Sequence, residues 1–319
     1  MRVRLCALAA VLVLTGCTTG MPGVPEAGEE LPLTSSVLGE PTTIDPCSLT
    51  GSAAFEEIGT ARMPGTPTFD ECRVAVAVDG GHAYVWVGLL RDDPLTPDWR
   101  DRVASPGRGT TIGRLADTCD TVLVLADGVS VTATAEPVPG SRPGEDTLCH
   151  LTEAALRGAY EVLAAGQVRH WAPPVSSLAV VYACDVVQDR DIEAALGLDE
   201  VAESPYPAEH RCRWGDPDGD PPSAEVRFLV GVSPSAVDVP DGARSETLAG
   251  RTSWVVPGHD PELASCRIVT EHGDFGLGTG TREFAVLETA TGIARRGEDR
   301  CAPARTLAAT AWAGLPPLA

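Results

Sequence analysis

The sequence predicts an α+β protein of two tandem domains, each an antiparallel sheet of four to five strands flanked by an N-terminal and a C-terminal helix and stapled by disulfides. Three observations predict it: an export signal that ends in a cysteine, a set of four cysteines that occurs twice, and strand-like segments enclosed by helix-like ones. The chain has 319 residues, of which 43% are apolar. This length and composition suit about two packed domains.

The chain begins with the features of a lipoprotein signal peptide. A positively charged start at residues 2–4 precedes a short apolar core over residues 5–14, and the core ends in a Leu-Thr-Gly-Cys motif. This motif resembles the bacterial lipobox, so we expect residues 1–16 to be removed and Cys17 to carry acyl chains such as palmitate. Two or three chains hold a protein stably on a bilayer. The predicted location is the extracytoplasmic face of the cell membrane.

Residues 17–44 contain the lipidated cysteine and a segment rich in Gly, Pro, Thr, Ser and Glu, without apolar periodicity. Such a composition predicts a flexible tether. No later run approaches the roughly 18 apolar residues that a membrane span needs. The remainder is therefore expected to be a soluble ectodomain.

Eight further cysteines form two sets of four with similar spacings, and the surrounding pattern recurs with them. In each set the first cysteine precedes a helix-like segment, the second and third introduce strands, and the fourth precedes a closing helix. The period is far longer than that of a solenoid, which predicts a duplicated domain. We expect domains over residues 45–170 and 176–316, with a break at the Trp-Ala-Pro-Pro sequence of residues 171–174. The two sets are Cys47, Cys72, Cys119 and Cys149, then Cys184, Cys212, Cys266 and Cys301.

Hydrophobic periodicity predicts the elements inside each domain. Opening helices are expected over residues 48–58 and 186–196, and closing helices around Leu156 and Leu307. Alternation of apolar and polar residues predicts strands between them, with an Asp-Gly turn joining one hairpin. The predicted strands include residues 73–78, 83–89, 121–125 and 129–135 in the first domain, and 225–230, 266–270 and 282–289 in the second.

Four cysteines in each exported domain predict disulfides. Each set allows three pairings, and we favour the sequential one, because it ties a helix start to a strand start twice in each domain. Each bridge would contribute about 2–4 kcal/mol. A metal centre is disfavoured because no Cys-x-x-Cys spacing and no histidine cluster accompanies the cysteines. The favoured pairs are Cys47–Cys72, Cys119–Cys149, Cys184–Cys212 and Cys266–Cys301.

Charge and composition exclude several functions. The net charge is −21 and every one of the 24 basic residues is arginine, while lysine and asparagine are absent. A negative chain is a poor partner for nucleic acid. Without lysine, a Walker-A phosphate loop, a Schiff-base enzyme and a Ser-x-x-Lys acyl-enzyme are all excluded. The residue usage is typical of a very GC-rich genome.

Short motifs resemble those of an actinobacterial envelope lipoprotein family of unknown function. That family pairs an N-terminal Asp-Pro-Cys-x-Leu with a later Cys-x-Trp and closes with a helix that ends in a Leu-Pro-like stop. Residues 45–49, 212–214 and 312–316 are similar to these three features. They are split between the repeats, since residues 72–74 read Cys-Arg-Val and residues 183–185 read Ala-Cys-Asp. The resemblance implies a secreted, non-enzymatic lipoprotein, with some sensor-like relatives, and it supplies no catalytic or ligand-binding residue.

Other segments that imitate functional motifs have simpler interpretations. Residues 216–220 alternate aspartates as a calcium loop does, but the closing glutamate is missing, so a polar turn is predicted. Residues 274–280 are interpreted as a glycine-rich turn, and residues 231–235 lack the second glycine of a nucleophile elbow. We predict surface or loop positions for His82, His150, His170, His210, His259 and His272. We predict core positions for Trp86, Trp214 and Trp254.

The leading functional hypothesis is a membrane-anchored binding or sensing module of the cell envelope, with a small molecule or an envelope protein as its partner. We predict no catalytic, cofactor-binding or metal-binding residue, and no cofactor. A structural or assembly role is the first alternative, and it predicts a broad apolar surface instead of a pocket. A secreted hydrolase is the second, and it requires Ser, His or carboxylate groups that converge in one cleft.

Overall fold

The computed structural model describes residues 30–318 except for short gaps, and from Pro32 onward the chain forms one compact unit. Cys17, the predicted lipidation site, and the predicted signal peptide lie outside the described residues. So do residues 18–29 of the predicted tether. The gaps are residues 66–67, 92–98, 116–117, 217–219, 238, 241–242, 261–262, 276–279 and 294–298.

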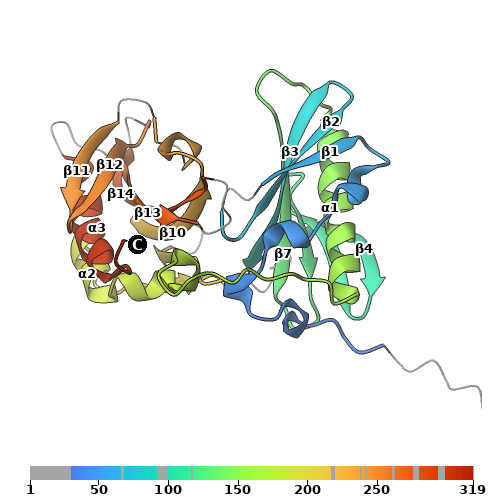
Figure 1. Cartoon of the computed structure of the whole chain (residues 1–319), viewed down its shortest axis with the longest axis horizontal. Coiled ribbons are helices and arrows are strands. Elements are labelled where there is room, and N and C mark those ends of the chain that lie inside the picture. Colours follow the sequence, from blue (N-terminus) through green and yellow to red (C-terminus); the bar gives the residue numbers. More distant parts are fainter. Residues whose placement is uncertain are drawn as a thin grey trace, which may run out of the picture. The chain divides into compact units, whose positions relative to one another are not determined.

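The first domain is a seven-stranded antiparallel sheet with one long helix on a single face (Figure 1). Helix α1 (Glu145–Ala164) packs on the central strands β3, β6 and β7. The strand order is β1-β2-β3-β7-β6-β5-β4. The strands are β1 (Thr60–Gly65), β2 (Cys72–Val78), β3 (Gly81–Arg91), β4 (Trp99–Gly107), β5 (Thr110–Leu115), β6 (Thr121–Val124) and β7 (Ser130–Pro137).

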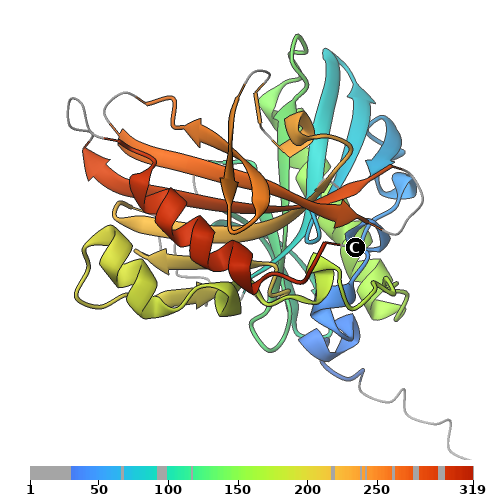
Figure 2. The same ribbon diagram turned by 60° about the vertical axis from the view of Figure 1, so that its left-hand side comes forward.

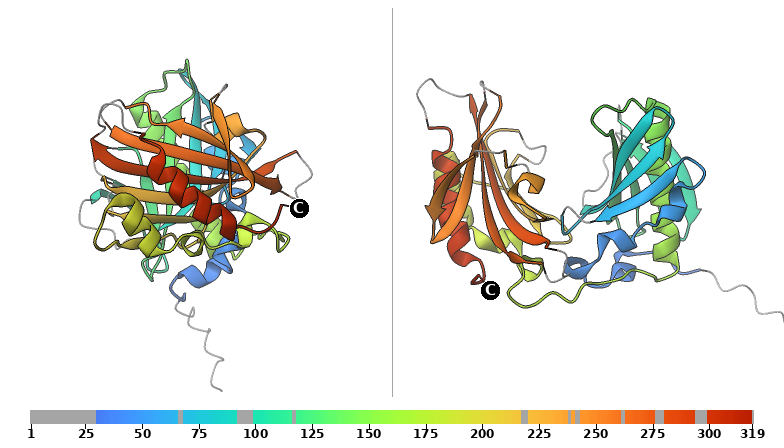
Figure 3. Two further views of the ribbon diagram at one scale, coloured as in Figure 1. Left: turned by 90° about the vertical axis from the view of Figure 1, so that its left-hand side faces the viewer. Right: turned by 45° about the horizontal axis from the view of Figure 1, so that its top comes forward.

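The second domain repeats this architecture. Helix α3 (Ala302–Gly314) crosses one face of its sheet, as Figure 2 and the left view of Figure 3 show, and α2 (Asp189–Leu196) packs beside α3. The strand order is β8-β9-β10-β14-β13-β12-β11. The strands are β8 (Glu203–Pro205), β9 (Arg211–Gly215), β10 (Ser223–Gly231), β11 (Arg244–Leu248), β12 (Arg251–Pro257), β13 (Leu263–Asp274) and β14 (Arg282–Ile293).

The two strand orders are the same when each domain is read from its own first strand. The predicted α+β class and the two similar sheet domains are thus present, but each sheet has seven strands, so the prediction of four to five was wrong. The strands that were missed include edge strands β1, β8 and β11, which have little apolar alternation to reveal them. Backbone pairing to a neighbour forms these strands more than burial of their own side chains does.

The opening helices differ from the prediction. Residues 48–58 form no α-helix, and the chain instead makes short 3₁₀ turns at Pro46–Ser48 and Ser52–Phe55. The Asp45 carboxylate accepts a hydrogen bond from the Cys47 amide at 3.0 Å, which caps the first turn. Glycine at residue 51 interrupts the segment, which favours two short turns over one continuous helix. The second domain does form a helix, but α2 begins three residues later than predicted, at Asp189.

The four disulfides join the cysteines in the sequential pairing that we favoured. Cys47–Cys72 and Cys184–Cys212 each attach a 3₁₀ turn to the second strand of a domain. Cys119–Cys149 and Cys266–Cys301 each attach the closing helix to the sheet. Equivalent bridges therefore occupy equivalent places in the two repeats.

Residues 33–44 pack on the first domain. Leu33 and Leu38 are fully buried in its core, and the Ser35 amide and hydroxyl both donate to the Asp127 carboxylate at 2.8 and 2.7 Å. The prediction of a flexible tether up to residue 44 was therefore wrong for this part. The two apolar side chains are too widely spaced to produce a periodic signal.

Helices among the described residues are either too short or too polar to cross a membrane. Four disulfides are typical of proteins exported from the reducing cytoplasm.

Candidate binding site

Two histidines occupy positions that the sequence did not predict. His210 and His272 are 1% and 4% exposed, so the prediction of surface or loop positions was wrong for them. His272 Nδ1 lies 3.1 Å from an Arg251 guanidinium nitrogen, and its Nε2 lies 2.7 Å from the Ser176 carbonyl oxygen. Burial and the Arg251 charge lower the pKa of His272. The hydrogen bond to the Ser176 carbonyl oxygen acts in the opposite direction but does not outweigh them. Neutral His272 thus supports Arg251, which donates to the carbonyl groups that end α3. The other four histidines are exposed as expected.

The tryptophans divide between core and surface. Trp214 is fully buried beneath α3 as predicted. Trp86 is only partly buried, on the face of the first sheet opposite α1, so its predicted core position was wrong. Trp254 is partly buried and packs against a small cluster that contains Phe284 on the outer face of the second sheet.

The motif-like segments supply no converging groups among the described residues. Residues 217–219 and 276–279, which hold the centres of the two predicted turns, lie outside the described residues. Phe275 is buried in the second core instead of serving a kinase-like site. The Gly-Val-Ser-Pro-Ser segment runs from the end of β10 into a 3₁₀ turn at Pro234–Val237.

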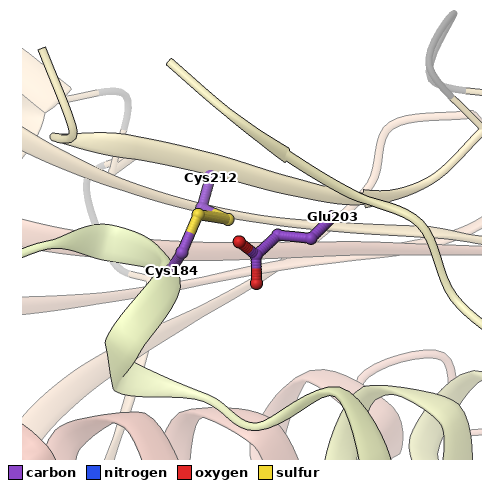
Figure 4. Close-up of side chains that lie close together, drawn as sticks. All are labelled: Cys184, Glu203 and Cys212. Carbon is purple, nitrogen blue, oxygen red and sulfur yellow. A yellow bond between two sulfur atoms is a disulfide. The ribbon is translucent and has the colours of Figure 1, made fainter. Parts of the chain in front are cut away.

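A disulfide and a carboxylate form the group shown in Figure 4. The sulfur atoms of Cys184 and Cys212 and a carboxylate oxygen of Glu203 lie within 4.8 Å of one another. The two sulfur atoms are covalently joined at 2.05 Å, and neither is the thiolate that ligates metals. Burial, with Asp189 and Asp185 nearby, raises the pKa of Glu203. In the disulfide form this group is therefore an acidic cluster beside a structural bridge.

A buried ion pair joins the segment before β2 to the start of β9. His210 Nδ1 lies 2.6 Å from an Asp70 carboxylate oxygen, and Nε2 lies 3.0 Å from the Ala179 carbonyl oxygen. Both partners are acceptors, so both ring nitrogens donate and His210 is the imidazolium. Burial opposes this charge, but Asp70 and the two hydrogen bonds raise the pKa of His210. With both nitrogens occupied and the ring buried, His210 has no nitrogen with which to accept a substrate proton.

Aromatic rings surround this pair. Phe69 packs against the His210 ring at 5.0 Å and against Trp171 and Phe275 at 6.0 and 5.3 Å between centroids. Next to it, burial and the neighbouring Asp70 raise the pKa of Glu71 to about 7, against the opposing charges of Arg211 and Arg227. The aromatic cluster and the ion pair fix the segment before β2 on the second domain.

The outer face of the second sheet, opposite α3, carries a network of four arginines around two glutamates. One oxygen of Glu225 accepts from Arg211 at 2.8 Å and from Arg213 at 2.9 Å. One oxygen of Glu288 accepts from Arg227 at 2.8 Å and from Arg267. We call Arg211, Arg213, Arg227, Arg267, Glu225 and Glu288 the arginine array. These residues come from four adjacent strands, β9, β10, β14 and β13, and β-sheet register places them side by side.

The array keeps the Glu225 carboxylate charged. Burial opposes ionisation of Glu225, but the charges and hydrogen bonds of Arg211, Arg227 and Arg213 outweigh it and lower the pKa. The Nε atoms of Arg211 and Arg227 are buried without a hydrogen-bond partner. Glu71 also interacts electrostatically with Arg211 and Arg227, so the arginine array borders a third acidic side chain.

A cavity of about 580 Å³ opens over one side of the array. Its floor contains Arg213, Glu225, Arg267 and Glu288. Its remaining wall comes from neighbouring strand ends and the loop after β12, and includes Ser265, His259, Val256, Pro257 and Leu263. The volume lies within the range of small-molecule sites, and the mixture of apolar wall and a few polar groups is typical of them.

A second cavity of about 470 Å³ lies beyond the end of β12. It shares Val256, Pro257 and His259 with the first cavity, and its other wall includes Arg244 and Arg305. Arg305 is held by Glu246 at 2.7 Å and by Asp299 at 2.8 Å. Arg305 is thus held by two ion pairs in this wall. The array cavity is the larger of the two, and we take it as the stronger candidate.

Sequence reasoning found the strands of the array but not the array itself. Arginine at residues 211 and 213, and Glu225 with Arg227, show the alternation that places them on one face of two strands. The pairing of β10 with β14 and of β14 with β13 then brings Glu288 and Arg267 beside them. That register was not predictable from the chain alone, since Arg213 and Glu288 are far apart in sequence. Comparisons with protein-family models, curated proteins and solved structures returned no match.

Proposed function

We propose that this chain is a lipid-anchored, extracytoplasmic binding protein, without catalytic activity, whose second domain holds a small-molecule ligand in the cavity over the arginine array. The observation that carries the proposal is this cavity, which has the volume and the mixed wall of a ligand site. The disulfides and the lipobox-like motif at residues 14–17 support the location. The buried His210–Asp70 pair supports the non-catalytic part, because its ring nitrogens are both engaged.

The anchor has a direct test. Cys17→Ala, expressed in a bacterium that processes lipoproteins, should lose labelled palmitate and move from the membrane to the soluble fraction. Cys6→Ala, which changes the other cysteine of the N-terminal region, is the matched control and should behave as the wild type. Retention of Cys17→Ala in the membrane after a carbonate wash would contradict the anchoring proposal.

Ligand binding is tested by a thermal-shift screen on the full chain in mild detergent. The panel contains sugars, amino acids, nucleosides, carboxylates and phosphate esters, so that no chemical class is assumed. Ser265→Trp places a large ring at the cavity wall and should abolish any shift. Ser245→Trp on β11, which does not line the cavity, is the matched control. A shift that survives Ser265→Trp, or no shift with any class, would refute the assigned site.

A further inference from the structure

We propose that the surface joining the two domains is an approximate two-fold interface, whose opposite charges make each repeat the specific partner of the unlike repeat. The inference concerns this surface alone and is independent of the ligand site. In a two-fold interface, equivalent segments of the two partners contact each other. Equivalence is defined here by the bridges Cys47–Cys72 and Cys184–Cys212, which occupy equivalent places in the two repeats. We call residues 41–43 and 68–71 of the first domain, and residues 178–180 and 208–211 of the second, the junction.

Two short 3₁₀ turns form the first contact between equivalent segments. Pro41–Thr43 begins six residues before Cys47, and Leu178–Val180 begins six residues before Cys184. These two turns pack against each other. A junction between unrelated surfaces would place each turn against a different element of the other domain. Their direct contact is the arrangement that a two-fold relation requires.

The segments before the second strand of each domain form the second such contact. Asp70 and His210 each lie two residues before the second cysteine of their set. They form the buried ion pair of 2.6 Å, in which their side chains are only 7% and 1% exposed. Glu71 and Arg211, the residues that follow them, are also equivalent, and the Arg211 charge favours ionisation of the Glu71 carboxyl group. Two successive positions of one repeat thus interact with the same two positions of the other.

Apolar side chains cross the junction in both directions. Phe69, from the first domain, is buried in the core of the second, where it contacts the His210 ring. Ala208, from the second domain, is buried in the core of the first. Phe69 lies three residues before its cysteine and Ala208 lies four before its own, so the two-fold relation is approximate. This reciprocal exchange supplies an attraction that does not depend on charge.

Charge then decides which repeats can form the junction. If two first domains met through these segments, one Asp70 would face the other, and two second domains would place His210 against His210. Each like pair would bury two groups without a partner of opposite charge, which disfavours the association. The unlike pairing instead joins a carboxylate to an imidazolium. The junction therefore favours closure of one chain on itself over association of like domains from two copies.

The first test reproduces a like pairing inside one chain. His210→Asp places two carboxylates opposite each other, and His210→Asn has nearly the same shape without the second charge. Hydrogen exchange of the full chain, at pH 7 in mild detergent, follows the amides of Asp70 and Glu71, which donate to the Thr68 hydroxyl at 3.1 and 2.8 Å. Exchange should be at least ten-fold faster in His210→Asp than in the wild type, and at least three-fold faster than in His210→Asn. Equal exchange in the two variants would overturn the selection by charge.

The second test reverses the pair. Asp70→His combined with His210→Asp keeps both side chains and exchanges their places, and equivalent surroundings should accept them in either direction. The double variant should recover at least half of the logarithmic change in exchange rate that His210→Asp causes alone. Recovery stays incomplete because Glu209 and Glu283 favour a positive charge at residue 210 and the Ala179 carbonyl loses its donor. Exchange as fast as in His210→Asp, or faster, would overturn the two-fold relation.

Two controls tie the result to the junction. Glu153→Gln weakens an ion pair with Arg114 inside the first domain and should leave exchange at the junction within two-fold of the wild type. The amides of the central strands β3 and β13 should be unchanged in every variant, and equal acceleration there would overturn the assignment to the junction, because whole domains would then unfold. If His210→Asp does not fold, a folded double variant is the same recovery. A double variant that does not fold either would overturn the proposal.

Discussion

The outer faces of the two sheets differ at equivalent positions. In each repeat an arginine follows the disulfide-bonded cysteine of the second strand, Arg73 in β2 and Arg213 in β9. The guanidinium of Arg73 lies over the rings of Tyr84 and Trp86, at 4.9 and 5.4 Å from their centroids. Arg213 instead donates to Glu225, which takes the place that Trp86 has in the first repeat.

The neighbouring position differs as well. Glu71 precedes the cysteine in the first repeat and Arg211 precedes it in the second. The disulfides and strand order are thus common to both domains, while the outer faces have become aromatic in one and ionic in the other. The two domains share the parts that stabilise the fold and differ on the face where we place the ligand.

The largest expected effect tests the shared part. Cys47→Ser with Cys72→Ser, and Cys184→Ser with Cys212→Ser, each remove one equivalent bridge across 25 and 28 residues. Loop-closure entropy predicts a loss of about 3.5 kcal/mol of unfolding free energy in either case. Hydrogen exchange, resolved by peptide, measures each domain in the full chain. Losses that differ by more than about 1.5 kcal/mol would show that the repeats do not use these bridges equally.

The next effect tests the ionic face. Glu225→Ala removes the shared carboxylate of Arg211 and Arg213, whose side chains are only 21% and 22% exposed. Losing the carboxylate that these two partly buried guanidinium groups share should destabilise the second domain by about 3 kcal/mol. Glu136→Ala, which removes one acceptor from the Trp86 indole at 3.2 Å, should cost about 1 kcal/mol. Similar losses in a urea titration would refute the distinction between the two faces.

The same comparison explains what the sequence could predict. The disulfides and the central strands were predictable because each is encoded locally, by cysteine spacing and by alternation around residues such as Val74 and Val226. The edge strands and the 3₁₀ turns were not, because their side chains carry little apolar pattern. The array was also not predictable, since Glu288 meets Arg227 only through the register of β14. His210 was misplaced because its burial depends on Asp70, which belongs to the other repeat.

A smaller effect depends on pH and distinguishes Glu71 from its counterpart Arg211. Burial raises the pKa of Glu71 from 4.5 to about 7, so the folded chain binds this proton more tightly than the unfolded chain does. Protonation therefore stabilises the fold, and this stabilisation is lost as the pH rises from about 4.5 through 7. Glu71→Gln should remove the part of the pH dependence of the unfolding free energy that comes from Glu71. Above pH 7 this variant should be more stable than the wild type by about 1–2 kcal/mol.

Thermal or urea unfolding of the two chains from pH 4 to pH 9 measures this difference. His210, whose pKa is raised by Asp70 despite burial, loses its stabilising charge in the same direction as the pH rises. It is present in both chains, so the difference between them isolates Glu71. A difference that stays constant across the range would mean that Glu71 titrates normally.

The smallest effect tests the aromatic face. Arg73→Gln loses the contact with two rings and should destabilise the first domain by about 1 kcal/mol. The attraction between a guanidinium and a ring quadrupole acts at short range, so the loss should be nearly the same in 0.1 M and 1 M salt. The loss of stability in Arg213→Gln should be smaller in 1 M than in 0.1 M salt, because this substitution breaks an ion pair in which about a fifth of the arginine side chain is exposed.

Double-mutant cycles that combine Arg73→Gln with Trp86→Leu, and Arg213→Gln with Glu225→Gln, measure each coupling at both salt concentrations. If the Arg73 coupling weakens with salt as much as the Arg213 coupling does, the first face is also held mainly by charge, and the divergence of the two repeats is smaller than their side chains indicate.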